Sequence, residues 1–173
     1  MTSPPTAIRG DIVVADIEIA APPERVFRAL VDPGELGAWW QRASVGLTTR
    51  WTLEARRGGA WRAEGRDDAC GPWMLHGRVV TFDPPRALAY TWNERIDPAY
   101  RESLPVETLV RYDLTATPAG TRVTVTHSGF PVPSAIRDGY ANGWPEVLDL
   151  LAAHLDDLTR RDPTTRPPGA PDA

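Results

Sequence analysis

The side chains in this sequence that could do chemistry are a few histidines and tyrosines among many tryptophans. His127 ends an alternating run in which Val123 and Val125 share its face, so its imidazole should point inward. There it could bind a ligand or move a proton near neutral pH. Tyr90 and Tyr112 point inward by the same parity. A hydrogen-bonded core histidine is an equally simple interpretation of His127, so both are carried forward.

The other two histidines offer less. His76 lies in mid-strand on the parity of Arg78, which leaves open whether it faces a ligand or solvent. His154 lies off the apolar stripe of the last predicted helix and is expected to be exposed. The 3 His and 1 Cys have no HxxxH or CxxC spacing, so we expect no metal site. No G-x-S-x-G elbow is present, and no cofactor is implied.

The tryptophans suggest a wall for a flat ligand. Seven are many for 173 residues, and their indole N–H groups can orient a polar group of a ligand. Core packing is the alternative at each position and the favoured interpretation at Trp92 and Trp144. The residues predicted to line a ligand site are Trp40, Trp51, Trp73, His76, Tyr90, Trp92, Tyr112, His127, Trp144 and Leu148.

The elements that must position these residues follow from hydrophobic periodicity. Residues 12–19 predict a strand, prolines 22 and 23 begin a short helix, and residues 32–34 separate it from a second short helix over 35–40. Further strands are predicted over 45–53, after the Gly58-Gly59 hairpin turn, and over 73–82, 88–92, 106–114 and 123–127. Gly71-Pro72 is interpreted as a break, and residues 93–105 as a loop.

The last element is a long helix. Its apolar stripe consists of Trp144, Val147, Leu148, Leu151, Leu155 and Leu158. The predicted fold is therefore α+β, with a curved antiparallel sheet of about six to seven strands around a long C-terminal helix. Two short helices follow the first strand and plug one end. Residues 11–160 form this domain, whereas the Pro-containing ends, 1–10 and 161–173, are predicted to be disordered.

Charge and composition exclude several classes of function. The net charge is −4 and the arginines are scattered, so there is no basic face for nucleic acid. Cys70 stands alone, which excludes an intrachain disulfide. The sequence shows no secretory signal and no apolar stretch long enough to cross a bilayer. A cytoplasmic protein without membrane contact is expected.

The motifs resemble the START-like (SRPBCC) helix-grip superfamily, the birch-pollen-allergen-like fold. Within it they look most like homologues of the heat-shock-protein-90 ATPase activator. The matching segments are residues 21–30, 39–40, 77–79, 83–88, 90–92, 120–127 and 143–144. The resemblance implies a ligand cavity between the sheet and the last helix. Pro145 departs from the family pattern, so the helix either kinks there or begins its straight part there.

The leading functional hypothesis is a non-catalytic binder of a small hydrophobic, aromatic metabolite, of the carrier, sequestration or self-resistance type. It rests on the parity, the tryptophans and the lack of a recognisable catalytic set, so the answer on enzymatic activity leans towards no. The resemblance also implies two alternatives, a polyketide cyclase or aromatase and a co-chaperone-like interaction module. A homodimer is left open, and chaperone contact is not expected.

Overall fold

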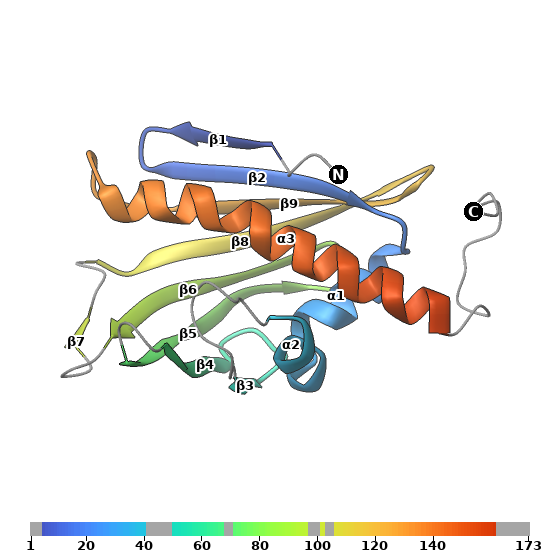
Figure 1. Cartoon of the computed structure of the whole chain (residues 1–173), viewed down its shortest axis with the longest axis horizontal. Coiled ribbons are helices and arrows are strands. Elements are labelled where there is room, and N and C mark those ends of the chain that lie inside the picture. The colour runs from blue at the N-terminus through green and yellow to red at the C-terminus, as the bar shows by residue number, and fades with distance from the viewer. Residues whose placement is uncertain (1–4, 41–49, 68–70, 97–100, 103–105, 162–173) are drawn as a thin grey trace.

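The computed structural model describes residues 5–40, 50–67, 71–96, 101–102 and 106–161 (Figure 1). Its elements in chain order are β1 (Thr6–Arg9), β2 (Ile12–Ile19), α1 (Pro23–Val31), α2 (Pro33–Trp39), β3 (Arg50–Leu53), β4 (Ala60–Asp67), β5 (Gly71–Asp83), β6 (Ala87–Ile96), β7 (Arg101–Glu102), β8 (Thr108–Thr117), β9 (Gly120–Ser128) and α3 (Ala135–Arg161).

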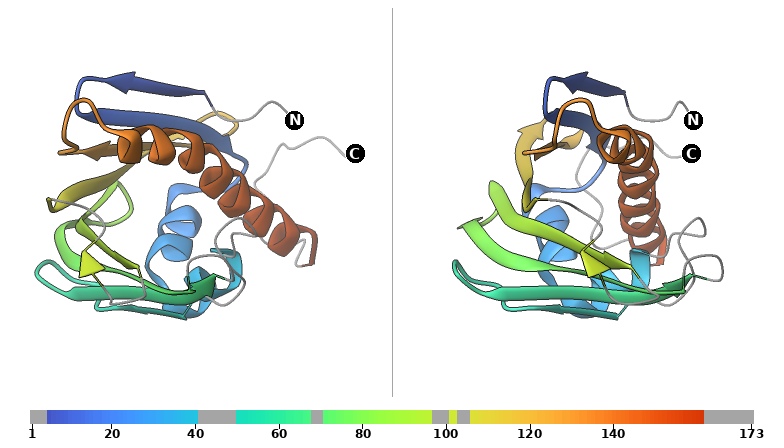
Figure 2. Two further views of the ribbon diagram at one scale, coloured as in Figure 1. Left: turned by 60° about the vertical axis from the view of Figure 1, so that its left-hand side comes forward. Right: turned by 90° about the vertical axis from the view of Figure 1, so that its left-hand side faces the viewer.

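The strands form one antiparallel sheet that curls around a helix. Among the described residues it has nine strands in the order β1-β2-β9-β8-β6-β5-β4-β3, with β7 paired to β6. Figure 2 shows α3 lying across the concave side, with α1 and α2 at one end. The predicted α+β fold is confirmed. The predicted strand number was too low because β1 and β7 were not expected.

One residue, Asp32, caps both short helices: it is the C-cap of α1 and the N-cap of α2. Asp32 ends α1, where its backbone N–H donates to the Arg28 carbonyl at 2.9 Å. The Asp32 side chain then caps α2 by accepting from the Glu35 N–H at 2.9 Å. Because Pro33 suits a first helical turn, α2 begins earlier than the predicted residue 35.

The last helix is longer than its leucine stripe. It begins at Ala135 and continues through Pro145, so the segment before Pro145 is helical too. Its buried face contains Ala141, Gly143, Trp144, Val147, Leu148, Leu151 and Leu155, whereas Leu158 is only half-buried. Among the helices of the described residues, none has the length and hydropathy to span a membrane.

Several sequence expectations about the strands need correction. Thr6–Arg9 was predicted to be disordered but pairs with β2; its four side chains are all exposed, so no apolar pattern marks it. Gly71-Pro72 begins β5 instead of breaking the chain, since Gly71 takes a φ of 82° that favours glycine. Strand β6 runs on to Ile96, inside the predicted loop.

At the other end of that loop, Val106 precedes β8 and is 45% exposed, although its parity predicted burial. The predictions for residues 1–4, 45–49, Cys70 and 162–173 fall outside the described residues.

Candidate functional site

Six aromatic side chains form a closed circuit of ring contacts between the sheet and the helices. The circuit runs from Trp40 through Trp51, Trp61, Tyr90, Tyr112 and Trp144 back to Trp40, with neighbouring ring centroids 4.8–6.2 Å apart. Trp92 packs against four members of the circuit, at 5.0–6.2 Å. Most of these pairs are tilted or edge-to-face, the geometry that aromatic quadrupoles favour. These seven residues are termed the aromatic cluster.

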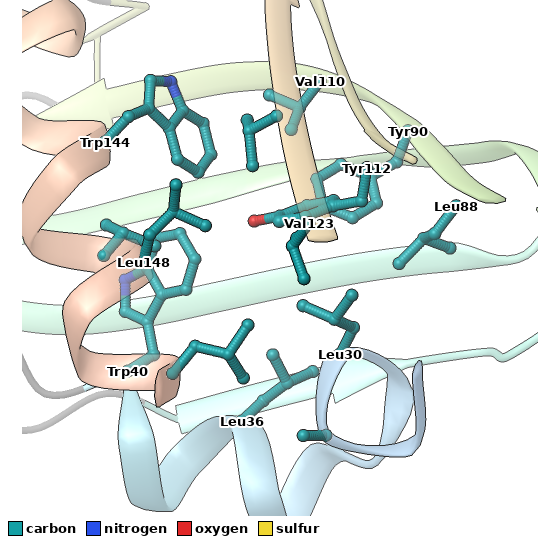
Figure 3. Close-up of a cluster of buried hydrophobic side chains, with 14 of the residues drawn as sticks. Leu30, Leu36, Trp40, Leu88, Tyr90, Val110, Tyr112, Val123, Trp144 and Leu148 are labelled. Atoms are coloured by element: carbon teal, nitrogen blue, oxygen red, sulfur yellow. The ribbon is translucent and has the colours of Figure 1, made fainter. Parts of the chain in front are cut away.

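The cluster draws on both sides of the fold. Tyr90 and Trp92 alternate on β6, and Tyr112 lies on β8, where it pairs in register with Leu88. Trp144 comes from α3, whose backbone packs on β1 and β2, and Trp40 follows α2. Figure 3 shows Trp144, Trp40 and Leu148 facing Tyr112 across the interior. Large rings therefore bridge the space between helix and sheet.

Trp61, which the sequence did not assign to the site, is fixed by an unusual crossing. It pairs in register with Gly77 of β5, and its indole N–H donates to the Thr91 carbonyl on β6 at 2.9 Å. A Cβ at position 77 would overlap that carbonyl and meet the Trp61 Nε1 at 2.7 Å. Because residue 77 has no side chain, the Trp61 indole can cross β5 and reach β6.

His127 is completely buried and hydrogen-bonded at both ring nitrogens. The Trp144 indole can only donate, and it donates to His127 Nδ1 at 3.3 Å. The proton must then be on Nε2, which donates to the Thr108 hydroxyl at 2.8 Å. Thr108 donates in turn to the Trp92 carbonyl at 3.2 Å. Burial lowers the pKa of His127 to about 3, so the ring is neutral. This geometry favours the core interpretation of His127.

A second chain of hydrogen bonds involves Tyr140, a residue that sequence reasoning missed. The Trp92 indole donates to the Tyr140 hydroxyl at 2.8 Å, and that hydroxyl donates to a Glu94 carboxylate oxygen at 3.4 Å. The Tyr140 ring also packs on His127, with centroids 4.6 Å apart. Its position four residues before Trp144 places it on the same helical face, which was an available signal.

Two polar groups of the aromatic cluster contrast with these chains. The Tyr112 hydroxyl oxygen and the Trp51 indole nitrogen are buried and have no hydrogen-bond partner among the residues that the structure describes. Burial raises the pKa of Tyr112, and the neighbouring Tyr90 phenol raises it further without meeting hydrogen-bond geometry. Burial also raises the pKa of Tyr90. Both phenols are therefore protonated at neutral pH. In Figure 3 the Tyr112 oxygen lies among carbon side chains.

The remaining predicted site residues have different surroundings. Leu148 is fully buried, and Trp73 is buried on β5. His76 pairs in register with Arg62, the neighbour of Trp61, and so lies on the opposite face of the sheet from that indole. The structure therefore brings Leu148 to the aromatic cluster and leaves His76 outside it.

His154 is half-buried, not exposed as expected. Its Nε2 lies 3.2 Å from a Glu35 carboxylate oxygen, because α2 packs beside α3. Glu35 also pairs with Arg25 at 2.8 Å and Arg28 at 3.2 Å. One carboxylate thus ties the three helices together.

A surface groove of about 670 Å³ lies away from the aromatic cluster. Its charged lining includes Asp83 with Arg86 and Arg111 with Asp113, each pair hydrogen-bonded within itself. The Arg86 guanidinium lowers the pKa of the exposed Asp83 carboxyl. These two pairs are matched within themselves, whereas the aromatic cluster contains buried polar groups without a partner in the described structure, so the cluster is the stronger candidate.

Comparison with known proteins assigns the chain to a family. The family model described as activator of Hsp90 ATPase homolog 1-like protein matches residues 20–156. The chain belongs to this family. That matched span contains every member of the aromatic cluster, together with His127, Thr108 and Tyr140. No curated protein matches the chain significantly.

Solved structures agree with the activator of Hsp90 ATPase homolog 1-like fold. A Mesorhizobium loti protein is 28% identical, with a TM-score of 0.67 over 84% of this chain and 97% of that one. A Chromobacterium violaceum protein is 25% identical, with a TM-score of 0.63 over 82% and 95%. A Rhodobacter sphaeroides protein, 23% identical with a TM-score of 0.73 over 91% and 98%, supports the fold alone. Membership of the family suggests a ligand-binding helix-grip fold and leaves the ligand to be inferred from the site.

Proposed function

We propose that this protein binds a small apolar aromatic molecule at the aromatic cluster, between the sheet and α3. The observation that carries the proposal is the pair of unpartnered buried groups, the Tyr112 oxygen and the Trp51 nitrogen. Leaving a buried polar group unsatisfied costs about 1–3 kcal/mol. A ligand that supplied the missing partners would recover this free energy.

The chemistry of the cluster favours a flat, apolar ligand. Its side chains are indoles and phenols at 1–5% exposure, surrounded by Leu30, Leu36, Leu88, Val110, Val123 and Leu148. Faces and edges of such rings pack well against another aromatic ring. Burial of apolar surface would supply most of the affinity, and the few polar groups would set the orientation.

The same residues favour binding over catalysis. His127, the side chain best suited to proton transfer, is neutral and has both nitrogens committed to Trp144 and Thr108. Tyr90 and Tyr112 remain protonated and can only act as hydrogen-bonding groups at neutral pH. The aromatic cluster as described therefore holds no general base. A carrier or sequestering protein follows from this arrangement.

Calorimetric titration with naphthalene and 1,4-diethylbenzene tests the proposal. We expect saturable binding of one site per chain. Trp51→Ala should weaken it about 10-fold or more because it removes one wall of the cluster. Trp39→Ala is the matched control, since the Trp39 indole is held by the Ala29 carbonyl at 2.9 Å and lies outside the circuit. Circular dichroism verifies folding. Absence of saturable binding, or equal losses in two folded variants, would refute the proposal.

A further inference from the structure

The two unpartnered groups lie on opposite sides of the aromatic circuit. From Trp51 to Tyr112 there are three ring contacts by way of Trp61 and Tyr90. There are also three in the other direction, by way of Trp40 and Trp144. Trp51 belongs to β3 and Tyr112 to β8, so the two groups come from separated parts of the sheet. Because Trp92 packs against four members of the circuit, a ligand that reached both groups would lie against that indole, with one end at each group.

Both groups are hydrogen-bond donors that lack an acceptor. An indole nitrogen donates and never accepts. The Tyr112 phenol keeps its proton and can donate it, and it is 1% exposed, against 5% for Trp51. Water has little access to either atom. The complement of this pair is a ligand with an acceptor oxygen at each of two opposite ends.

The surroundings exclude a charged ligand. Among the described residues the buried polar or charged side chains are Thr108, Thr121 and His127. Thr108 and His127 belong to the satisfied chain, and the Thr121 hydroxyl donates to the Ala21 carbonyl at 2.7 Å. Among the described residues, no carboxylate or guanidinium is buried with the aromatic cluster. A charged group of a ligand would therefore be desolvated without a counter-charge, at a cost of several kcal/mol.

We infer that the ligand is an uncharged planar aromatic carbonyl compound, whose acceptor oxygens at opposite ends bind the Tyr112 hydroxyl and the Trp51 indole N–H. This inference rests on the proposed function and defines its ligand class. It makes Tyr112 and Trp51 the residues that select carbonyl compounds over hydrocarbons of the same shape.

Three para-substituted benzenes of matched shape test the inference by calorimetry. They are 1,4-diethylbenzene without an acceptor, 1,4-diacetylbenzene with an acceptor at each end, and 4-acetylbenzoate with one end charged. Tyr112→Phe and Trp51→Phe should each lower the affinity for 1,4-diacetylbenzene about 2- to 10-fold, the range for one lost hydrogen bond. In both variants the affinity for 1,4-diethylbenzene should fall less than the affinity for 1,4-diacetylbenzene, because the hydrocarbon has no hydrogen bond to lose. The anion should bind at least about 10-fold more weakly than the diketone.

Trp39→Phe is the matched control for Trp51→Phe, because the Trp39 indole N–H is already bonded to the Ala29 carbonyl at 2.9 Å and its ring lies outside the circuit. It should leave the affinity for both uncharged probes unchanged. If 1,4-diethylbenzene binds but Tyr112→Phe leaves diketone affinity intact, the carbonyl inference is wrong and the proposed function stands. Tighter binding of 4-acetylbenzoate than of the diketone also overturns the inference. If no probe binds, the proposed function and the inference both fail.

Discussion

The two polar side chains that pack on Trp144 differ in how completely their hydrogen bonds are formed. His127 and Tyr112 have ring centroids 5.8 and 6.1 Å from Trp144, and both are at most 1% exposed. His127 is bonded at both nitrogens, whereas the Tyr112 oxygen has no partner in the described part of the chain. Burial alone would put both in the core. Their hydrogen bonds assign one to the fold and the other to the ligand.

The largest expected effect on stability comes from breaking the hydrogen bonds of His127. His127→Leu keeps most of the volume but leaves the buried Trp144 N–H without an acceptor. We expect a loss of roughly 1–3 kcal/mol in the free energy of unfolding, the cost of such an orphaned group. Urea denaturation measures it. A loss below about 0.5 kcal/mol would mean that the His127 chain contributes little to the fold.

A smaller effect should appear on acidification. Burial lowers the pKa of His127 from 6.5 to about 3 in the folded protein, so the unfolded chain takes up this proton first as the pH falls. The contribution of His127 is complete above pH 6.5 and declines between pH 6.5 and about 3. At pH 5.5 the loss should be on the order of 1 kcal/mol. It is read as the difference between wild type and His127→Leu, which lacks this titration; parallel pH profiles would contradict it.

The smallest expected effect on stability comes from removing the Tyr112 hydroxyl. Tyr112→Phe removes an oxygen for which the described residues supply no hydrogen-bond partner, so we expect the free protein to lose no bond. Its free energy of unfolding should stay within about 0.5 kcal/mol of wild type or rise. The same urea titration gives the value. A loss above about 1 kcal/mol would show that the oxygen is bonded in solution, with Tyr90 as the nearest candidate, and would erase the contrast with His127.

Strand parity predicted the inward-facing residues well. The period of two on β6, β8 and β9 correctly placed Tyr90, Trp92, Tyr112 and His127 in the interior, because one face of this sheet is buried. The leucine stripe likewise predicted the buried face of α3. Strand β1 could not be predicted, since its exposed side chains carry no apolar alternation and its place in the sheet comes from backbone pairing with β2.

Strand parity could not predict whether each buried polar group has a hydrogen-bond partner. It depends on which side chains meet, and those partners are far apart in sequence. Thr108 reaches His127 across 19 positions, and Trp92 reaches Tyr140 across 48. Only strand register and the position of α3 bring them together. The sequence therefore left His127 open between a core residue and a ligand contact, and the register of β5 was needed to place His76 on the opposite face.

The crossing of the Trp61 indole over Gly77 restricts how this sequence can vary. Any side chain at position 77 would collide with the Thr91 carbonyl, and the nearest group it could displace is the indole nitrogen bonded to that carbonyl. Replacing Trp61 alone would in turn leave a hollow above the glycine. Relatives that keep this strand geometry should thus keep glycine at 77 whatever residue they have at 61. In a library randomised at both positions, tryptophan should survive selection for folding almost exclusively with glycine.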